Sequence, residues 1–373
     1  MFVPVSKPFL DEVEINNVTE AITKKDISGL AGTFLPEFEE GFARYCGVKY
    51  GAAVNSGTTA LHLAVAALGI GKDDEVLVAT MTNMATFFAV LYQGAKPIPI
   101  DCEPDTLNID TKLIEAKITS RTKAIIVVHL YGHPVDMDPI MEIAKKHNLF
   151  VIEDAAEAHG AKYKGKVVGG IGHIGCFSFY SNKIITTGEG GMVVTDDKEL
   201  IEKCRLLKNL AFGDKDKFMH QALGFKYQMT NLQAAVGVGQ LKKIEKIIER
   251  KREIADYYIK HLSGVKDIIL PVEKPYAYNV YWMFNILLTG SLSGKRQVLM
   301  SKLLEGGVQT REDFVPYNEQ EIFLKEGIVE KDSCPVASSL YSDGLYLPSG
   351  TDITEEELAF VVDRFIKVID NLK

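Results

Sequence analysis

Paired cysteines are missing from this sequence. Its five cysteines are odd in number, widely scattered and free of any C-x-x-C pair. Neither a disulfide framework nor a zinc site is therefore expected, and we predict that the protein binds no metal. Free cysteines at such spacings fit a reducing compartment, so we expect a cytoplasmic protein.

Long apolar runs and an excess of positive charge are missing as well. No apolar segment approaches membrane-spanning length, and Pro4 and Pro8 interrupt the N-terminus where a signal peptide would have its apolar core. The chain has 50 acidic and 42 basic residues, a formal net charge of −8. Nucleic-acid-binding surfaces need clustered Lys and Arg on a basic background. We therefore expect neither a membrane nor a nucleic acid as a partner.

The sequence does contain a regular alternation of short apolar runs with helical patterns. Four of the runs, at residues 76–79, 97–100, 124–128 and 149–152, are continuously apolar rather than alternating. Continuous apolar strands between helices indicate a mostly parallel sheet that is buried on both faces. An α/β fold is therefore predicted.

The pattern changes near residue 265, after a long amphipathic helix predicted at 240–262. Beyond it come strands, a helix and a terminal helix at 354–372, which predict a smaller α+β domain. We place the boundary inside the long helix, so that residues 1–245 form a large domain and residues 246–373 a small one.

A helix is also predicted near the N-terminus, at residues 11–25. Its apolar side chains Val13, Ile15, Val18 and Ile22 lie near one face. We expect that face to pack in the core.

Polar residues follow two of the apolar strands directly. His129 and Tyr131 come after the strand at 124–128, and Glu153 and Asp154 close the next one. Ligands of open α/β sheets bind at the carboxyl ends of the strands. We expect a ligand site at this edge.

A strand, turn and helix unit at residues 51–68 has the turn sequence Asn55-Ser56-Gly57-Thr58-Thr59. Small hydroxyl residues and a glycine at a helix N-terminus leave backbone N–H groups free to bind a phosphate. An ordinary Ser/Thr helix cap has the same pattern. The turn by itself leaves both interpretations open.

A glycine-rich stretch from Gly170 to Gly175 matches the dinucleotide fingerprint G-x-G-x-x-G. The residues that follow it, 176–180, are predicted to form a strand, whereas the fingerprint must open a helix. We therefore reject a nicotinamide site and assign these glycines to a turn.

Lys183 lies between the strand at 177–180 and a second glycine-rich turn at 187–191. Burial between apolar strands lowers the pKa of a lysine and makes it able to form a Schiff base. Lysines at such positions also extend to solvent. The local pattern alone does not decide between these two interpretations.

Taken together, four motifs in this order resemble the DegT/DnrJ/EryC1/StrS family of nucleotide-sugar aminotransferases, which have the pyridoxal-phosphate fold type I. The four motifs are the stretches 55–63, 153–160, 177–191 and 229–235, and the resemblance extends from about Val3 to Val368. Within the family, the sequence is most similar to GDP-perosamine synthases, in residues 128–133 and in Glu157. The resemblance implies a large domain with a mostly parallel seven-stranded sheet between helices, plus a smaller C-terminal domain.

The resemblance also implies roles for the catalytic and cofactor-binding residues. Lys183 would bind pyridoxal 5'-phosphate covalently and then serve as the base, and Asp154 would pair with the pyridinium nitrogen. The other residues placed at the cofactor are Gly57, Thr58, Thr59 and Ser178 for the phosphate, Glu157 beside the ring, and Asn83 where relatives have a stacking aromatic residue. Asn231 would reach the cofactor phosphate of a neighbouring subunit, which implies a homodimer with shared active sites.

The implied reaction moves an amino group from L-glutamate to a 4-keto-6-deoxy nucleotide sugar, with conversion of GDP-4-keto-6-deoxymannose to GDP-perosamine favoured. Such products serve O-antigen and other polysaccharide biosynthesis. Residues implied at the substrate are Glu157, His159, Lys226, Gln228 and Arg311. A dTDP- or UDP-linked keto sugar aminated at C3 or C4, another ketone, and a non-catalytic cofactor-binding regulator remain as alternatives. The family's sugar dehydratases carry histidine in place of the lysine, so Lys183 argues against that reaction.

Overall fold

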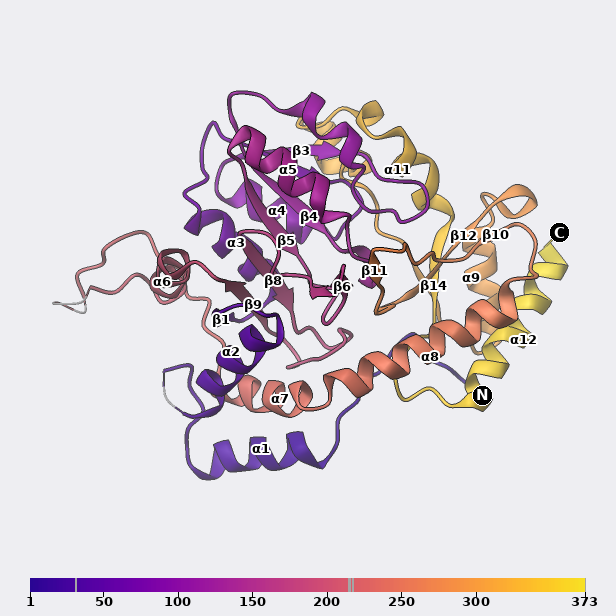
Figure 1. Ribbon diagram of the computed structural model, residues 1–373. Coiled ribbons are helices and arrows are strands. Elements are labelled where there is room, and N and C mark those ends of the chain that lie inside the picture. Colours follow the sequence, from indigo (N-terminus) through magenta and orange to yellow (C-terminus); the bar gives the residue numbers. More distant parts are fainter. Residues whose placement is uncertain (31, 214–215, 217, 373) are drawn as a thin grey trace.

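The computed structural model describes residues 1–30, 32–213, 216 and 218–372, and its centre is a seven-stranded sheet in the order β1-β9-β8-β5-β4-β2-β3 (Figure 1). The strands are β1 (Tyr50–Val54), β2 (Glu75–Ala79), β3 (Lys96–Ile100), β4 (Thr122–Val128), β5 (Phe150–Asp154), β8 (Ile174–Ser178) and β9 (Gly191–Thr195). Among these seven described strands, β9 runs in the direction opposite to the other six. The predicted mostly parallel seven-stranded sheet is confirmed.

Helices cover both faces of this sheet, which explains why its strands are continuously apolar. Val76 and Val78 of β2 belong to one core cluster, to which α3 (Gly57–Ala67), α4 (Ala85–Tyr92) and α6 (Lys198–Leu207) also contribute. Leu77 and Ala79 point the other way, into a second cluster. The helices of that second face are α2 (Phe34–Tyr45), α5 (Met137–His147) and α7 (Asn231–Leu241). Successive side chains of a strand therefore enter different cores.

The helix α1 (Glu12–Thr23) lies outside α7, and its packing differs from the prediction. Val13, Ile15 and Ile22 are 39%, 63% and 57% exposed. Ala21 and Glu14 are the buried residues of the helix. The prediction for those three apolar residues was therefore wrong, because the small and polar side of the helix is the one that meets α7.

The C-terminal part is built on the antiparallel sheet β10-β12-β14-β13. Its strands are β10 (Ile268–Ile269), β12 (Phe284–Leu288), β13 (Arg311–Glu312) and β14 (Gly344–Leu347), and its helices are α9 (Arg296–Glu305), α10 (Glu321–Lys325), α11 (Pro335–Leu340) and α12 (Glu355–Leu372). A small three-stranded sheet, β11-β6-β7, joins the two parts, with strands β11 (Ala277–Tyr278), β6 (Lys162–Tyr163) and β7 (Lys166–Val167).

The long helix α8 (Ile244–Leu262) runs along one side of the molecule from α7 to the C-terminal part (Figure 1). Its first turns, with Ile244 and Ile247, belong to the core beneath the large sheet. Tyr258 and Leu262 belong to the C-terminal core. The domain boundary predicted at residue 245 stays a prediction, because α8 is continuous there and contributes to both cores.

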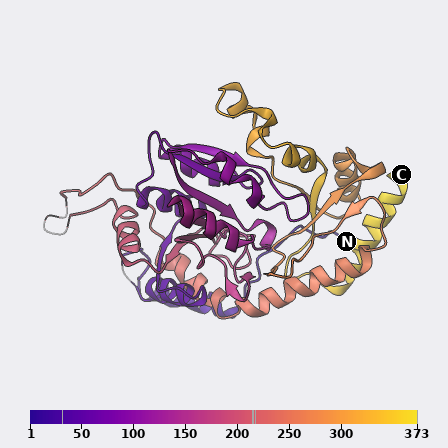
Figure 2. The same cartoon turned by 45° about the horizontal axis from the view of Figure 1, so that its top comes forward.

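The described residues among 208–213, 216 and 218–226, here called the arm, project from the body in both ribbon views (Figures 1 and 2). Isolated bridges pair Asn209 with Lys226 and Phe212 with His220, so the described part of the arm doubles back on itself.

Within the described residues, no helix has both the length and the apolar character needed to cross a membrane.

Candidate active site

A cavity of about 280 Å³ opens at the carboxyl ends of the parallel strands, where the sequence predicted a ligand site. The register pairs Val128 with Asp154 and Asp154 with Cys176, so β4, β5 and β8 end side by side. Eight of the predicted site residues line the cavity: Gly57, Thr58, Asn83, Asp154, Glu157, Ser178, Lys183 and Arg311. The sheet topology therefore brings together motifs that are far apart in the sequence.

One wall of the cavity is the first turn of α3. Ser56 caps this helix, and Thr59 completes a capping box with it, since the Thr59 N–H donates to Ser56 Oγ over 3.1 Å. Thr59 is occupied in this way and does not line the cavity. A Cβ atom on Gly57 would lie 2.6 Å from Ser178 Cβ, so only glycine allows the helix end to approach β8 this closely.

The free N–H groups of this first turn lie at the positive end of the helix, beside the hydroxyls of Thr58 and Ser178. Such an arrangement fits a phosphate group. The helix cap and the phosphate cradle are thus combined in one turn: Ser56 and Thr59 form the cap, and the cavity-facing side remains open.

Asp154 closes β5 and is almost fully buried, with 5% of its surface exposed. Thr86 Oγ1 donates to its Oδ2 over 2.7 Å, and the N–H of Ala156 donates to its Oδ1 over 3.2 Å. Burial raises the pKa of Asp154, although these hydrogen bonds and the positive charge of Lys183 act in the opposite direction. A protonated ring nitrogen facing Asp154 would offset that burial cost, so this carboxylate fits a pyridinium ring.

Lys183 turns its amine into the cavity rather than out to solvent, and its role as the cofactor lysine stays a prediction. Its Nζ lies 3.7 Å from Glu157 Oε1 and 3.9 Å from the centre of the Trp282 ring. Burial lowers the pKa of Lys183, while the carboxylates of Glu157 and Asp154 counteract that effect. A lysine of lowered pKa is suited to covalent bonding with an aldehyde.

Glu157 is held by an unusual backbone conformation at Tyr131. The N–H of Tyr131 donates to Glu157 Oε2 over 3.0 Å, and Tyr131 has a positive φ of 53°, which is uncommon for a residue other than glycine. Burial raises the pKa of Glu157 to about 7, with the charge of Lys183 acting against the rise. Glu157 therefore changes charge near neutral pH.

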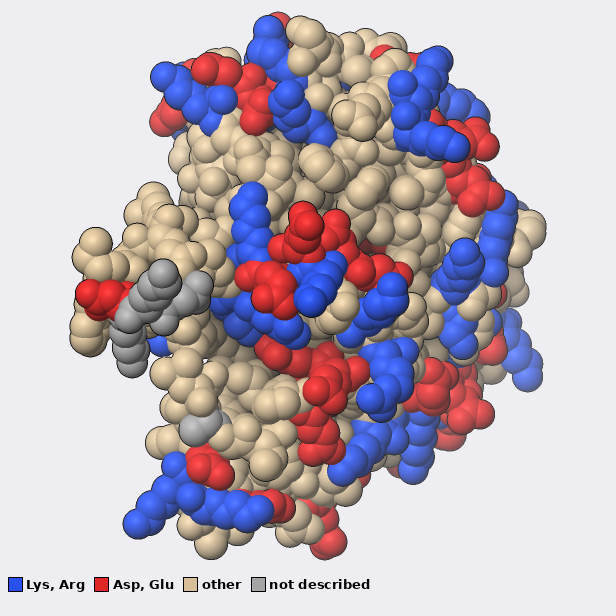
Figure 3. Space-filling view, turned by 60° about the vertical axis from the view of Figure 1, so that its left-hand side comes forward, with Lys and Arg blue, Asp and Glu red and all other residues tan. Residues whose placement is uncertain are grey.

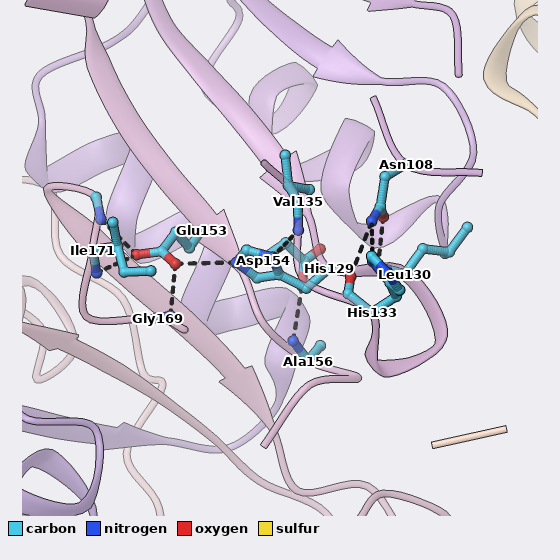
Figure 4. Close-up of polar contacts among 11 residues, drawn as sticks. Asn108, His129, Leu130, His133, Val135, Glu153, Asp154, Ala156, Gly169 and Ile171 are labelled. Carbon is cyan, nitrogen blue, oxygen red and sulfur yellow. Dashed lines mark hydrogen bonds and ion pairs between the residues drawn. The ribbon is translucent and has the colours of Figure 1, made fainter. Parts of the chain in front are cut away.

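Glu153, behind Asp154, gives the glycine-rich stretch a structural role (Figure 4). Its buried carboxylate accepts hydrogen bonds from the N–H groups of Gly169, Ile171 and Gly172 over 2.7, 2.7 and 2.6 Å. These amides form a nest around a carboxylate of the protein itself. The turn that resembles a dinucleotide fingerprint thus fixes the end of β5, next to Asp154.

His129 completes this support from the neighbouring strand (Figure 4). The N–H of Val135 donates to His129 Nδ1 over 3.0 Å, so Nε2 carries the proton and donates to Glu153 over 3.0 Å. Burial alone would raise the pKa of Glu153, but the hydrogen bonds from His129 and the nest lower it. An ionised Glu153 therefore ties β4, β5 and the glycine turn together.

Four further predicted residues lie outside the cavity in this chain. Asn231 uses both ends of its amide elsewhere: Nδ2 donates to Asp26 O over 2.6 Å, and Oδ1 accepts from the N–H of Leu35 over 3.0 Å. Its role in a neighbouring subunit stays a prediction. Lys226 and Gln228 hydrogen-bond to each other at the base of the arm, where Lys226 is exposed.

The fourth of them, His159, is fully buried. Its ring packs against Phe42, Phe177 and Phe179, and both ring nitrogens are buried with no hydrogen-bond partner among the described residues. Burial lowers its pKa to about 3, so it is neutral at physiological pH. This position places His159 beneath the strand that carries Ser178 rather than in the cavity.

Trp282, Phe314 and Tyr346 close the cavity from the C-terminal part, and sequence reasoning missed Trp282 and Tyr346. The ring of Tyr131 lies parallel to that of Phe314 and close to Trp282 and Tyr346. Trp282 is the only tryptophan of the chain, and this is the one signal that pointed to it. Thr86, which bonds to Asp154, had no signal at all.

Comparison with known proteins agrees with this geometry. Residues 8–366 match the DegT/DnrJ/EryC1/StrS aminotransferase family. The chain is 41% identical to GDP-perosamine synthase of Caulobacter vibrioides, covering 99% of this chain and 98% of that protein. It is 36% identical to dTDP-3-amino-3,4,6-trideoxy-alpha-D-glucose transaminase of Streptomyces venezuelae, covering 95% and 94%.

Among solved structures, the PLP form of Spr1654 from Streptococcus pneumoniae superposes with a TM-score of 0.94 at 26% identity and covers all of both chains. The fold, the cofactor and the enzyme class predicted from the sequence are therefore confirmed. The chain belongs to the DegT/DnrJ/EryC1/StrS aminotransferase family and is a pyridoxal-phosphate-dependent sugar aminotransferase.

Proposed function

We propose that the protein transfers the amino group of L-glutamate to C4 of a 4-keto-6-deoxy nucleotide sugar, with GDP-4-keto-6-deoxymannose as acceptor and GDP-perosamine as product. The observation that carries the transfer chemistry is the Lys183 amine, 3.7 Å from Glu157 in the cavity that Asp154 also lines. The choice of acceptor is supported by the 41% identity to a GDP-perosamine synthase over nearly the whole chain. A dTDP-linked keto sugar is the second candidate, because a transaminase of that class is 36% identical.

The cavity residues can divide the work as follows. Pyridoxal phosphate, when bound, supplies an electron sink for the negative charge that develops on the substrate carbon. Asp154 would keep the ring nitrogen protonated, and the first turn of α3 with Thr58 and Ser178 would hold the phosphate. Lys183 Nζ would take a proton from the amino-bearing carbon of the substrate. Glu157, beside that amine, would stabilise its protonated form.

We also propose a homodimer whose two active sites are shared. The arm exposes Phe218, Met219 and Leu223, which are 77%, 67% and 89% accessible, and exposed apolar clusters of this kind mark contact surfaces. On the face seen in Figure 3, basic and acidic residues are intermixed and separated by broad uncharged areas. The dimer would bring Lys226 and Gln228 of one chain to the cavity of the other. We propose the cytoplasm as the location of the protein.

The acceptor is tested by incubating the purified enzyme and L-glutamate with GDP-, dTDP- and UDP-linked 4-keto-6-deoxy sugars while 2-oxoglutarate release is measured. We expect the GDP-linked sugar to give the highest kcat/KM. A higher kcat/KM for a dTDP- or UDP-linked sugar would show that this sugar, and not the GDP-linked one, is the acceptor. If none of the three releases 2-oxoglutarate, nucleotide sugars of this kind are excluded.

The role of Lys183 is tested with Lys183→Ala. This variant should lose both the visible absorption of the bound cofactor and the amino transfer. Glutamate alone should change the absorption spectrum of the wild-type enzyme, because the first half of the reaction needs no keto sugar. A protein that binds the cofactor only as a regulator would show no such change.

A further inference from the structure

Trp282 forms the wall of the cavity that faces the Lys183 amine. It lies between β11 and β12, about 100 residues after Lys183 in the sequence, and only 2% of its surface is exposed. The Lys183 Nζ atom sits over the indole face, 3.9 Å from the ring centre. On the carboxylate side, the same amine is 3.7 Å from Glu157.

Trp282 is held through both its ring and its backbone. Its Nε1–H donates to the carbonyl of Asn182, the residue before Lys183, over 2.7 Å. The carbonyl of Trp282 accepts from the Nζ of Lys251, a buried lysine in the middle of α8, over 2.9 Å. The ring therefore keeps a fixed place relative to the backbone that carries Lys183.

A face of an indole attracts a cation because its π electrons are negative. Between this face and Glu157, the charged form of the Lys183 amine has two favourable neighbours in an otherwise buried position. Asp154, Glu189 and Arg311 are the other charged groups that line the cavity. A base that takes up a proton and later returns it must remain in reach during both steps.

We propose that Trp282 is a positioning residue that holds the free Lys183 amine, in its protonated form, between the indole face and Glu157. The lysine is thereby kept at the substrate carbon whenever it is not bonded to the cofactor. This inference rests on the proposed role of Lys183 as the cofactor lysine and base. Its tests are made on the apoprotein without substrate. They can therefore fail although the enzyme transfers amino groups, and they can succeed although the proposed transfer is absent.

The first test uses the wild-type apoprotein, in which Trp282 is the sole source of tryptophan fluorescence. Ammonium groups in contact with an indole quench its emission, whereas neutral amines quench it much less. We expect the emission of the apoprotein to rise with pH as Lys183 loses its proton, and we expect this step to be missing in Lys183→Met. An identical pH titration in the two proteins would overturn the proposal.

The second test compares Trp282→Phe, which keeps an aromatic face, with Trp282→Leu, which does not. Reaction of Lys183 with acetic anhydride is followed by mass spectrometry of the apoprotein as a function of pH. We expect the midpoint for Trp282→Phe to stay near that of the wild type and the midpoint for Trp282→Leu to move to lower pH. At a fixed pH below both midpoints, the leucine variant should hold about fivefold more free amine.

Tyr278→Leu is the matched control, because Tyr278 lies on the same segment and contacts a different lysine, Lys162, through its ring. It should leave the labelling profile of Lys183 unchanged. A wild-type midpoint in Trp282→Leu, or an equal shift in the phenylalanine and leucine variants, would show that the aromatic face does not hold the amine. Thermal unfolding confirms that each variant is folded, and the fluorescence test decides the matter if the leucine variant is not.

Discussion

At the scale of single residues, the contact that most directly conditions the cofactor site is the one between Thr86 and Asp154. Thr86 Oγ1 accepts from Thr82 Oγ1 over 2.9 Å and donates to Asp154 Oδ2 over 2.7 Å. A hydrogen bond donated to a carboxylate favours its ionised form, which is the form that a pyridinium nitrogen needs. Thr86 would thus act on a bound cofactor through Asp154.

Thr86→Val should therefore weaken cofactor binding while the shape of the site is kept. A hydrogen bond to a charged group contributes about 1.5–3 kcal/mol, so we expect a loss of about 10- to 100-fold in affinity for pyridoxal phosphate. The measurement is an absorbance titration of the apoprotein. Thr82→Val, which removes the neighbouring hydroxyl but no bond to Asp154, is the control and should have a smaller effect. Equal affinities in wild type and Thr86→Val would refute the role.

Asp313 supports a prediction about pH. It is 4% exposed, its Oδ1 accepts from Asn285 Nδ2, and burial raises its pKa from 3.8 to about 7. The folded state then keeps a proton that the unfolded state releases near pH 3.8. Its contribution to stability is full below that pH and is lost as the pH rises through about 7.

The side chain in Asp313→Asn cannot ionise, so the pH dependence of stability that Asp313 causes should vanish. Relative to the wild type, the variant should gain up to roughly 4 kcal/mol in unfolding free energy between pH 3.8 and 7. Denaturant unfolding at several pH values measures the difference. Asp343→Asn is the control. The Asp343 carboxylate accepts hydrogen bonds from Ser293 Oγ and from the N–H of Gly294. Replacing this carboxylate should therefore destabilise the fold instead of stabilising it. A constant difference between wild type and Asp313→Asn across this pH range would contradict the prediction.

At the scale of elements, the cofactor site depends on how closely α3 approaches β8. A methyl group at Gly57 meets Ser178 Cβ at 2.6 Å, which must push the first turn of the helix away from the strand. Overpacking of this kind costs about 1–3 kcal/mol. Since the displaced N–H groups are those proposed to hold the phosphate, the cost should fall largely on cofactor binding.

Gly57→Ala is thus expected to lower the affinity for pyridoxal phosphate by about tenfold or more. Equilibrium dialysis of the apoprotein gives the dissociation constant. Gly264→Ala is a suitable control, because a Cβ atom there meets nothing within 4 Å. Wild-type affinity in Gly57→Ala would mean that the phosphate does not bind at the start of α3.

Local pattern was enough to predict most of these elements. The strands were recognisable because burial on both faces makes them continuously apolar. Asp154 and Gly57 both line the cavity because they follow strands whose ends the topology aligns. The failures have one physical cause in common. Periodicity shows that α1 has an apolar side, but Ile15 is exposed because the partner of that helix, α7, is decided only in three dimensions. Trp282 was missed for the same reason. It lies about 100 residues after Lys183 in the sequence, and only the three-dimensional fold brings it to the cavity.

At the scale of the whole molecule, one long-range feature shapes the cavity, and a second, the arm, belongs to the proposed dimer. The helix α8 joins the two cores, and Lys251 at its middle holds the carbonyl of Trp282, so the C-terminal part delivers a cavity wall in a fixed position. The arm, by contrast, carries exposed apolar residues away from the body (Figure 2). Lys226 and Gln228 at its base lie outside the cavity of their own chain. These positions are what a shared active site requires.

The proposed sharing of active sites makes a prediction for hybrid dimers. One chain carries Lys183→Ala, and the other carries Lys226→Ala with Gln228→Ala and a different affinity tag, so the hybrid can be isolated. Both parent homodimers should be nearly inactive. In the hybrid, one cavity combines an intact Lys183 with an intact arm from its partner, so about half of the wild-type kcat per dimer should return. A hybrid of Lys183→Ala with the wild-type chain should show the same half activity, since it also has one complete site. If the hybrid of the two variants is as inactive as its parents, each site is built from a single chain.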